Sequence, residues 1–372
     1  MTNLLSHSHR SSVEVDGAAL VQNANVIREH VGGAVGLIGV VKANAYGHGF
    51  AQVVPVLEPH VEMFAVASVA EAYEVTALAP EKPVLLLGPA APHERADALA
   101  AGFVPMVSSA AEAAVYSQLS RTGRSPVHLK LDTGMGRMGL WHEEAVAAVR
   151  EMRALHGIAI TGLATHLPVA DEDVAFTRTQ LDLFYDVAKV LREEEGLGKA
   201  RIHVCNSAGA IRFPKLAGDL VRVGLALYGS APVPEFQSRL LPVMTWKTVV
   251  TLVRDLPAGC SVSYGRTFIT PCAMRLATLA VGYADGYQRH LSNRGAHVVI
   301  RGERCPVLGR VTMDQIVVDV SGLSQCEAGD EAILLGAEIP ASELAQKAGT
   351  IPWEIYTGIG PRVHRLPVAS PA

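Results

Sequence analysis

Short apolar segments alternate with alanine-rich, helix-like segments from about residue 35 to residue 230, and this alternation restricts the fold more than any other feature. Fully apolar strands between helices are typical of a parallel sheet covered on both faces. We expect such strands at 35–41, 63–67, 84–87, 103–107, 126–131, 158–165, 201–205 and 220–224. Eight repeats in this length favour a closed (β/α)8 barrel over an open doubly wound sheet. The open sheet would also need a GxGxxG after its first strand, and none is placed there.

Several segments between these strands have the hydrophobic periodicity of helices, and the hydrophobic pattern changes in the last third of the chain. Helices are expected at 109–119, 142–155 and 174–195. After the proline-bearing segment 231–243 come alternating β-branched runs at 248–253, 276–283, 297–300, 315–320 and 331–335, and only 341–348 looks helical. We therefore expect a barrel over 12–240 and a mainly antiparallel β domain over 241–372, with residues 1–11 packing against the second domain.

Composition narrows the class of protein. The 372 residues are 49% hydrophobic and carry a net charge of -4, which allows a large core and offers no basic surface for nucleic acid. The five cysteines are scattered and odd in number, as in a reduced cytoplasmic protein, and no histidine or cysteine set has metal-ligand spacing. The N-terminus has no signal-peptide pattern, and no apolar run is long enough to span a membrane. We expect a cytoplasmic protein without metal, membrane or nucleic-acid partners.

Polar residues follow several predicted strands, at the edge where barrel enzymes place their active sites. The segment LIGVVKANAYGHG (37–49) puts Lys42 directly after an apolar strand, where desolvation lowers a lysine pKa and allows attack on carbonyl groups. The other strand-end residues are Lys130, Asp132, Arg137, His166, Asn206, Ser207, Arg222 and Gly224. Ser207 and Gly224 fall where many barrels bind phosphate. Spacing alone leaves two possibilities, a pyridoxal-phosphate enzyme and a Schiff-base aldolase acting on sugar phosphates.

Longer segments resemble one family. VVKANAYGHG (40–49), LKLDTGMGRMG (129–139), CNSAGAIRFP (205–214), VSYGRTF (262–268) and LGRVTMDQIVVDV (308–320) resemble, in order, the signatures of the alanine racemases. Nearly the whole chain is covered by the resemblance. It implies a pyridoxal-phosphate barrel with a C-terminal β domain, in a homodimer with shared active sites. The implied reaction is the interconversion of L- and D-alanine, which supplies D-alanine for peptidoglycan.

The resemblance also implies roles for individual residues. Lys42 would carry the cofactor and exchange the proton on the D-side, and Tyr264 of the partner subunit would exchange the proton on the L-side. The cofactor contacts would come from Lys42, Tyr46, His166, Asn206, Ser207, Arg222, Gly224, Leu225 and Tyr356. Arg137 and the backbone of Met313 would bind the substrate carboxylate, and Lys130 would be carbamylated. The substrate corridor would be lined by Asp171, Tyr283, Arg289 and Arg310.

Arg222 distinguishes the racemase from its rivals. An arginine keeps its proton, so it cannot pass one to the ring nitrogen of the cofactor, and an unprotonated ring is a weaker electron sink. A decarboxylase of the same fold would have an acidic partner there. A non-enzymatic, single-barrel pyridoxal-phosphate-binding protein would lack the β domain, and with it SYGRT and TMDQ. A broad-specificity racemase acting on serine, lysine or arginine remains the alternative.

Overall fold

The computed structural model describes residues 9–121 and 123–368, which form two compact units. In the described part of the chain, the first unit consists of the segment that ends at Ala19, of Tyr46–Gln52 and of the segment from Pro242 onward. The second unit consists of Leu20–Ala45 and Val53–Leu241. Residues 12–19 and 46–52 were expected in the barrel and instead lie in the first unit. Of residues 1–11, expected to pack with the β domain, 1–8 lie outside the described residues.

The second unit is built on a parallel sheet with the strand order β10-β2-β3-β4-β5-β6-β8-β9, and β7 pairs with β6. Its strands are β2 (Gly36–Val40), β3 (Met63–Val66), β4 (Val84–Leu86), β5 (Val104–Val107), β6 (Ser125–Asp132), β7 (Leu140–Trp141), β8 (Ile158–Ala164), β9 (Arg201–His203) and β10 (Leu220–Val223). Backbone hydrogen bonds from Asp219 to Ile202 (2.8 Å) and from Arg222 to Cys205 (2.9 Å) join the two ends. The sheet therefore closes, and the expected (β/α)8 barrel is confirmed.

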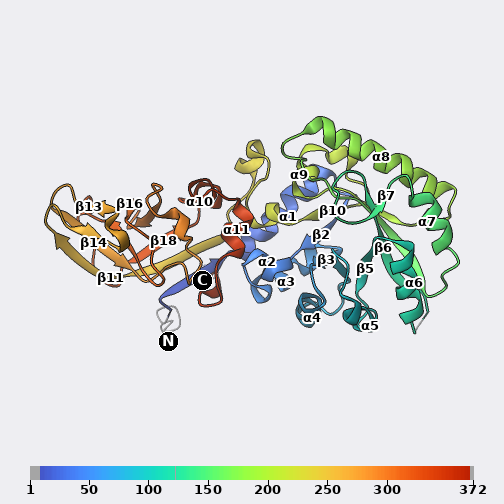
Figure 1. Ribbon diagram of the computed structural model, residues 1–372, viewed down its shortest axis with the longest axis horizontal. Helices are drawn as coiled ribbons and strands as arrows, with labels where there is room; N and C mark the ends of the chain where they lie inside the picture. The colour runs from blue at the N-terminus through green and yellow to red at the C-terminus, as the bar shows by residue number, and fades with distance from the viewer. Residues whose placement is uncertain (1–8, 122, 369–372) are drawn as a thin grey trace. The chain divides into compact units, whose positions relative to one another are not determined.

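Helices cover the outer face of this sheet (Figure 1). They are α4 (Val69–Leu78), α5 (Arg95–Ala100), α6 (Ala110–Leu119), α7 (Ala145–Met152), α8 (Val174–Glu193) and α9 (Ser207–Arg212). The boundary between the two units falls within helix α1 (Gly17–Val31) and again within helix α3 (Phe50–Leu57). The side chains of Ser68, Ser109 and Asp173 accept a backbone hydrogen bond at the start of α4, α6 and α8, which fixes where these helices begin.

The first unit contains a second sheet, in the order β14-β17-β16-β15-β18-β11-β1-β19. Its strands are β1 (Ser11–Val15), β11 (Met244–Leu256), β14 (Met274–Leu279), β15 (His297–Ile300), β16 (Glu303–Leu308), β17 (Ile316–Asp319), β18 (Glu331–Leu335) and β19 (His364–Pro367), beside a hairpin of β12 (Ser261–Val262) and β13 (Phe268–Ile269). Because β11 also pairs with β14, the path from β14 to β11 closes on itself. The pairs are antiparallel except β1 with β19, as expected of a mainly antiparallel domain.

Two elements of the first unit differ from the expectation. Strand β1 pairs with β11, where Val13 lies opposite Trp246, because its alternating apolar residues fit that sheet. Helix α10 (Ala341–Ala348) lies where a helix was expected, but it is not the only one, since α11 (Pro352–Thr357) follows. Six residues are too few to show helical periodicity. The short 3₁₀ turns of the chain are η1 (Glu58–His60), η2 (Pro92–Glu94), η3 (Pro214–Leu216), η4 (Leu225–Tyr228), η5 (Pro234–Arg239), η6 (Tyr264–Arg266) and η7 (Arg289–Leu291).

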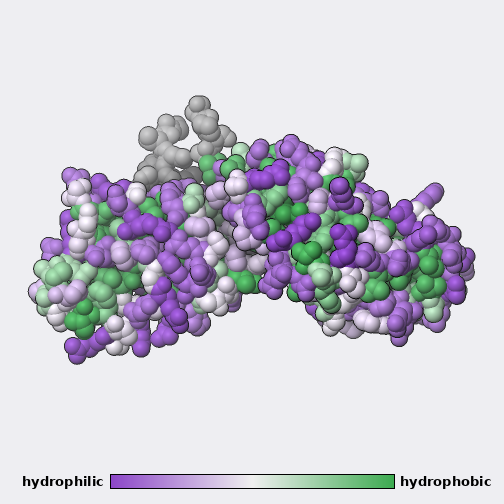
Figure 2. Space-filling model, turned by 90° about the horizontal axis from the view of Figure 1, so that it is seen from above, coloured by the Kyte–Doolittle hydropathy of each residue, from purple (hydrophilic) through white to green (hydrophobic). Residues whose placement is uncertain are grey.

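The surface and the thiols agree with the composition of the chain. Hydrophilic side chains cover most of the face visible in Figure 2. Among the described residues, no helix combines the length and the apolar character that crossing a membrane requires. The cysteines are free thiols, and Cys205, Cys305 and Cys326 are buried.

The first prediction concerns the attachment of α1 to the barrel. Asn23 is fully buried and donates to the carbonyl oxygens of Leu227 (3.0 Å) and Leu241 (2.8 Å), and it accepts from the backbone N–H of Leu241 (2.8 Å). Replacing Asn23 by Ala leaves these buried groups without partners, so we expect the free energy of unfolding to fall by roughly 2–4 kcal/mol. The exposed neighbour Gln22, replaced by Ala, should change it by less than about 0.5 kcal/mol. Equal urea unfolding curves for the two variants would contradict this account.

Candidate active site

The carboxyl ends of the parallel strands bring the predicted polar residues together in the second unit. We call Lys42, Lys130, Arg137 and Arg222 the rim cations. Burial and the charges of these four groups lower the pKa of His166 to about 2. The effect of Arg222 is the largest of the four, followed by Lys130, Arg137 and Lys42. All four groups therefore lie close enough to one imidazole to act on its charge, and Arg222 contacts it directly at 3.3 Å.

Arg222 is 4% exposed and its guanidinium donates only to neutral acceptors. These include the carbonyl oxygens of Thr165 (2.7 Å) and Val204 (3.1 Å), and Nδ1 of His166 (3.3 Å). It also donates to the carbonyl oxygen and to Nδ1 of His203. No carboxylate in the described part of the chain pairs with it. Burial lowers the pKa of Arg222 to about 10, so the side chain remains a cation at neutral pH.

Two buried imidazoles continue from Arg222 into the barrel. A guanidinium can only donate, so Nδ1 of His203 (2.9 Å away) accepts, and the neutral ring carries its proton on Nε2. That nitrogen then donates to Nδ1 of His128 at 2.8 Å. Burial lowers the pKa of His128 to about 4 and that of His203 well below its usual range, so both rings are neutral. Gly162 makes room, because a Cβ there would lie 2.5 Å from the His128 ring.

Lys130 lies on β6 and is 4% exposed. Burial and the charges of Arg222 and Arg137 lower its pKa well below the usual range, although the charge of Asp132 acts in the opposite direction. A lysine in this environment favours the neutral amine, which is the nucleophilic form of the side chain.

Asp132 ends β6 and organises the loop that carries Arg137. Its carboxylate accepts hydrogen bonds from the backbone N–H groups of Gly134, Met135 and Gly136, each at 2.9 Å. Burial alone would raise the pKa of Asp132, but these hydrogen bonds outweigh it and the pKa is lowered. Asp132 therefore shapes the loop, and Arg137 itself remains exposed to bind an anion.

Lys42 is half-buried, and the backbone that follows it is unusual. Burial, and then the charge of Arg137, lower its pKa, while the charge of Glu71 raises it. The segment α2 (Lys42–Tyr46) is a left-handed turn, with φ of 55° at Ala43, 52° at Asn44 and 53° at Ala45. This conformation costs an L-residue with a side chain about 1–2 kcal/mol. Consecutive strained residues of this kind concentrate at functional sites.

A hydroxyl and backbone amides gather at the ends of β9 and β10. The buried Ser207 Oγ accepts from the backbone N–H groups of Gly224 (3.1 Å) and Ala226 (3.4 Å), with Leu225 between them in the chain. The Ser207 hydroxyl proton and the backbone amides of this turn therefore lie together, which is the donor type that a phosphate site uses.

Two further predicted residues of the second unit have structural tasks. The side chain of Asn206 accepts from the backbone N–H of Gly209 (2.9 Å) and donates to the carbonyl oxygen of Leu167 (3.0 Å), so it caps α9. Asp171 lies in the loop after β8, and its carbonyl oxygen accepts from Arg212 at 3.4 Å. Both residues therefore shape loops at the strand ends.

Tyr46 and Tyr356 belong to the first unit, and both are buried. Gly47 has a φ of 77°, and a Cβ there would lie 2.2 Å from the carbonyl oxygen of Tyr356. Only glycine permits this close approach between the segment after Tyr46 and α11. Arg365 also donates to the carbonyl oxygen of Gly47 at 3.0 Å. Burial raises the pKa of Tyr46, so its hydroxyl keeps its proton.

Tyr264 is 71% exposed and lies on a strained turn of the first unit. The φ angles of its neighbours Ser263 and Gly265 are 61° and 72°. Ser263 Oγ donates to the carbonyl oxygen of Arg310 at 2.5 Å, and a Cβ at Gly265 would lie 2.7 Å from the Arg310 guanidinium. The predicted corridor residue Arg310 therefore packs against the Tyr264 turn. Arg289, at the start of η7, is exposed.

Tyr283 and Met313 lie on two loops that touch through their backbones. The N–H of Tyr283 donates to the carbonyl oxygen of Thr312, and that of Ala284 to the carbonyl oxygen of Met313, both at 3.0 Å. A Cβ at Gly282 would lie 2.3 Å from these two carbonyl oxygens. Because glycine lets the loops approach so closely, the Tyr283 and Met313 side chains are both left exposed on the same edge.

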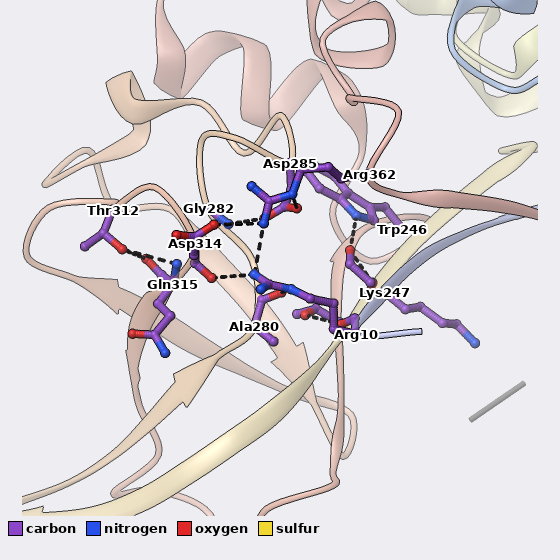
Figure 3. Close-up of polar contacts among 12 residues, drawn as sticks. Arg10, Trp246, Lys247, Ala280, Gly282, Asp285, Thr312, Asp314, Gln315 and Arg362 are labelled. Carbon is purple, nitrogen blue, oxygen red and sulfur yellow. Dashed lines mark hydrogen bonds and ion pairs between the residues drawn. The ribbon is translucent and has the colours of Figure 1, made fainter. Parts of the chain in front are cut away.

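A buried carboxylate fixes this pair of loops (Figure 3). Asp285 accepts from the backbone N–H of Gly282 at 2.9 Å and forms ion pairs with Arg10 (3.5 Å) and Arg362 (3.4 Å). Arg362 also pairs with Asp314 at 2.8 Å, on the other loop. Sequence reasoning missed this cluster, as it missed His128 and His203, because its members are far apart in the chain and share no motif.

The second prediction concerns the pH dependence of stability. Between pH 6.5 and its folded-state pKa of about 4, His128 binds a proton in the unfolded chain and not in the folded one. Falling pH therefore favours unfolding, by about 1 kcal/mol between pH 6.5 and pH 5.5 for this one group. In His128→Gln this part of the loss should disappear, whereas replacing the exposed His290 by Gln should leave the slope unchanged. Identical slopes of unfolding free energy against pH for wild type and His128→Gln would contradict the prediction.

Comparison with known proteins places both units in one family. Residues 15–232 match the family model of the alanine racemase N-terminal domain, and residues 243–367 match that of the C-terminal domain. The chain is 42% identical to an alanine racemase of Symbiobacterium thermophilum over 363 residues, covering 95% of this chain and 96% of the relative. It is 39% identical to one of Methylacidiphilum infernorum over 363 residues, covering 96% and 92%.

Solved structures agree with the sequence matches. An alanine racemase of Bartonella henselae with covalently bound pyridoxal phosphate superimposes with a TM-score of 0.88 at 29% identity, covering 96% of this chain and 99% of that one. An alanine racemase of Clostridium difficile 630 in complex with cycloserine has a TM-score of 0.88 at 31% identity, with coverage of 96% and 95%. The resemblance noted in the sequence is thereby confirmed, and the chain belongs to the alanine racemase family.

Proposed function

We propose that the protein racemises alanine with two bases on opposite faces of the substrate Cα, Lys42 and Tyr264 of the partner subunit. The observation that carries the proposal is that Lys42 and Arg222 belong to the paired strand ends of β2 and β10, with the Arg222 guanidinium 3.3 Å from Nδ1 of His166, in a member of the alanine racemase family. A dry, positively charged rim suits an anionic cofactor and a substrate carboxylate. As a member of this family, the protein is a pyridoxal-phosphate-dependent isomerase, and a relative solved with cycloserine supports a small-molecule substrate.

The donor set of the rim fits pyridoxal phosphate. Lys42 would hold it covalently, and the Ser207 hydroxyl with the amides of Gly224 and Leu225 would hold its phosphate, since these donors lie together at the ends of β9 and β10. All the residues that we assign to the cofactor are Lys42, Tyr46, His166, Asn206, Ser207, Arg222, Gly224, Leu225 and Tyr356. When bound, the cofactor supplies an electron sink that makes the substrate Cα–H bond acidic.

Arg222 is assigned to the ring nitrogen of the cofactor. Because its guanidinium remains charged and can only donate, it leaves that nitrogen without a proton of its own. A weaker electron sink limits decarboxylation and transamination and leaves proton exchange at Cα as the main reaction. The neutral chain from Arg222 to His203 and His128 supports this role, because it offers the guanidinium only an imidazole lone pair and no carboxylate that would neutralise its charge.

The two bases have different environments. Burial and the charge of Arg137 lower the pKa of Lys42, which increases the fraction of free amine that can accept a proton at neutral pH. Tyr264 is 71% exposed within its own chain, as expected of a hydroxyl that serves the site of a neighbouring subunit. Arg137 and the backbone of Met313 from the partner subunit are assigned to the substrate carboxylate, since a guanidinium binds a carboxylate in a bidentate manner.

Lys130 is assigned a carbamate. Its neutral amine attacks the carbon of CO2, so that an N–C bond forms while one C=O π bond breaks and its electron pair moves to oxygen. One amine proton is released to solvent. The product is an anion, and it replaces a buried amine near the positive charges of Arg222 and Arg137. An anion there would hold the Arg137 side chain in place for the substrate.

The exposure of the residues to which we assign functions supports a homodimer with shared active sites. Tyr264, Tyr283 and Met313 are large apolar or aromatic side chains, and all are exposed in the first unit. We assign the substrate corridor to Asp171, Tyr283, Arg289 and Arg310. A cytoplasmic location is supported by the free thiols, which are typical of a reducing compartment.

The third prediction tests cofactor attachment and substrate. The wild-type protein should show a visible absorbance band that borohydride shifts, and it should racemise alanine faster than serine, lysine or arginine. Lys42→Ala should lose both the band and the activity, because no other amine replaces the covalent link. The exposed Lys189, replaced by Ala, should change neither. A colourless wild type would refute the cofactor assignment, and faster turnover of serine, lysine or arginine would refute the substrate.

The fourth prediction tests Tyr264 and the shared site. Tyr264→Phe should keep the visible band but lose racemisation by about 10²–10⁴-fold, the usual effect of losing an acid–base group. The rate of Cα proton exchange with solvent should fall more when L-alanine is the substrate than when D-alanine is. The control Tyr73→Phe removes a hydroxyl from another exposed tyrosine and should be silent.

Mixing the two inactive variants tests the sharing itself. If each site uses Lys42 of one chain and Tyr264 of the other, a mixed dimer of Lys42→Ala and Tyr264→Phe has one intact site. Random exchange of subunits should then restore about a quarter of the wild-type activity. Verified mixed dimers without activity would show that the site is not shared in this way.

A further inference from the structure

The left-handed turn after Lys42 needs something to hold it. Four consecutive residues, from Ala43 to Tyr46, have φ between 52° and 55°, and none of them is glycine. Residues with a Cβ avoid this region and adopt it only where the surroundings enforce it. The direction of the Lys42 side chain depends on the turn, because Lys42 is its first residue. One bond within the turn, from the N–H of Ala45 to the carbonyl oxygen of Val41 (2.7 Å), closes it.

Glu71 contacts the turn from the first turn of helix α4. Its Oε1 accepts from the backbone N–H of Ala43 at 2.7 Å, and its Oε2 accepts from that of Ala67 at 2.8 Å. Its own N–H donates to Oγ of Ser68 at 3.2 Å, so the carboxylate projects from a fixed helix start. Hydrogen bonds to an ionised carboxylate are about twice as strong as neutral ones. One side chain therefore connects the backbone that follows β2 to the backbone that follows β3.

The chain contains a second copy of this helix start that lacks the extra contact. At α6, the N–H of Glu112 donates to Oγ of Ser109 (3.0 Å), and its Oε2 accepts from the N–H of Ser108 (2.8 Å). The Oε1 of Glu112 is buried and has no hydrogen-bond partner in the described part of the chain. Starting a helix thus uses one carboxylate oxygen, and the second oxygen of Glu71 is engaged elsewhere, at Ala43.

We propose that Glu71 is a positioning residue for Lys42: its carboxylate holds the left-handed turn and so fixes the direction of the lysine side chain. The inference rests on the proposed function of Lys42 and adds a residue that neither the motif nor the resemblance assigns. The charge of Glu71 also opposes the effects of burial and of Arg137 on the Lys42 amine. Glu71 therefore acts on Lys42 in two ways, through its hydrogen bond to the backbone of Ala43 and through its negative charge.

Glu71→Gln tests the proposal, with Glu112→Gln as the matched control. Glutamine offers one acceptor oxygen, so it can serve Ala67 or Ala43 but not both. In the holoenzyme we expect hydrogen–deuterium exchange of the peptide containing Ala43 to quicken at least about tenfold, because its amide loses protection. We expect kcat to fall about 10–100-fold, as for a misplaced catalytic group, with a smaller change in KM. Glu112→Gln should change neither.

A second substitution distinguishes positioning from a general loss of structure. Glycine adopts positive φ without a steric penalty, so Ala43→Gly should let the turn form without the carboxylate. Adding Ala43→Gly to Glu71→Gln should therefore recover at least about half of the lost kcat on a logarithmic scale. A residue that only started helix α4 would not be rescued in this way.

The outcomes separate this inference from the proposed function. A coloured, active wild type together with a Glu71→Gln variant that matches Glu112→Gln in exchange and kcat would overturn the role of Glu71 alone. Failure of Ala43→Gly to restore kcat would also overturn it. A wild type without the visible band would refute the assignment of Lys42 itself, whatever Glu71 does.

Discussion

Arg222 keeps a full positive charge inside the barrel, where its guanidinium donates only to carbonyl oxygens and imidazole nitrogens. Removing a cation from water costs several kcal/mol unless oriented polar groups replace the water. Here those groups come from the ends of β8 and β9, which lie beside β10 only because the sheet closes. The buried cation therefore depends on closure of the barrel, because closure brings its hydrogen-bond acceptors together. The remaining rim cations are arranged around this centre.

Carboxylates at the same strand ends do not neutralise the cations. Asp132 accepts from three backbone N–H groups of the loop that carries Arg137, and Glu71 accepts from the N–H groups of Ala43 and Ala67. Their charges stabilise backbone conformations that would otherwise cost free energy. No carboxylate in the described part of the chain forms an ion pair with a rim cation, and hydrogen bonds to Asp132 and Glu71 order the loops that carry Arg137 and Lys42. Both features suit the proposed site, in which a reacting carbon lies between two bases.

In the first unit, too, a carboxylate fixes the loops that carry predicted site residues. Asp285 is buried and ties together the loops of Gly282 and Asp314 through Arg10 and Arg362 (Figure 3). Glycine at 282 then lets two backbones approach closely, and glycine at 265 does the same for the Tyr264 turn. Tyr264 and Met313 are thus exposed on backbone that these close approaches hold in place. This exposure supports the proposal that they complete the site of another chain.

The sequence by itself determined the order of strands and helices, the two types of sheet, and the strand-end residues from Lys42 to Arg222, because periodicity and strand direction are local properties. The family resemblance also predicted roles for Tyr264 and Met313. The tertiary structure alone decided that Ser11–Val15 joins β11, that His128 and His203 extend from Arg222, and that Glu71 reaches Ala43. The helix start at Ser68–Glu71 has the same sequence pattern as the one at Ser109–Glu112, which lacks the extra contact. Such contacts join residues far apart in the chain, and their partners are chosen by the packing of strands and not by spacing.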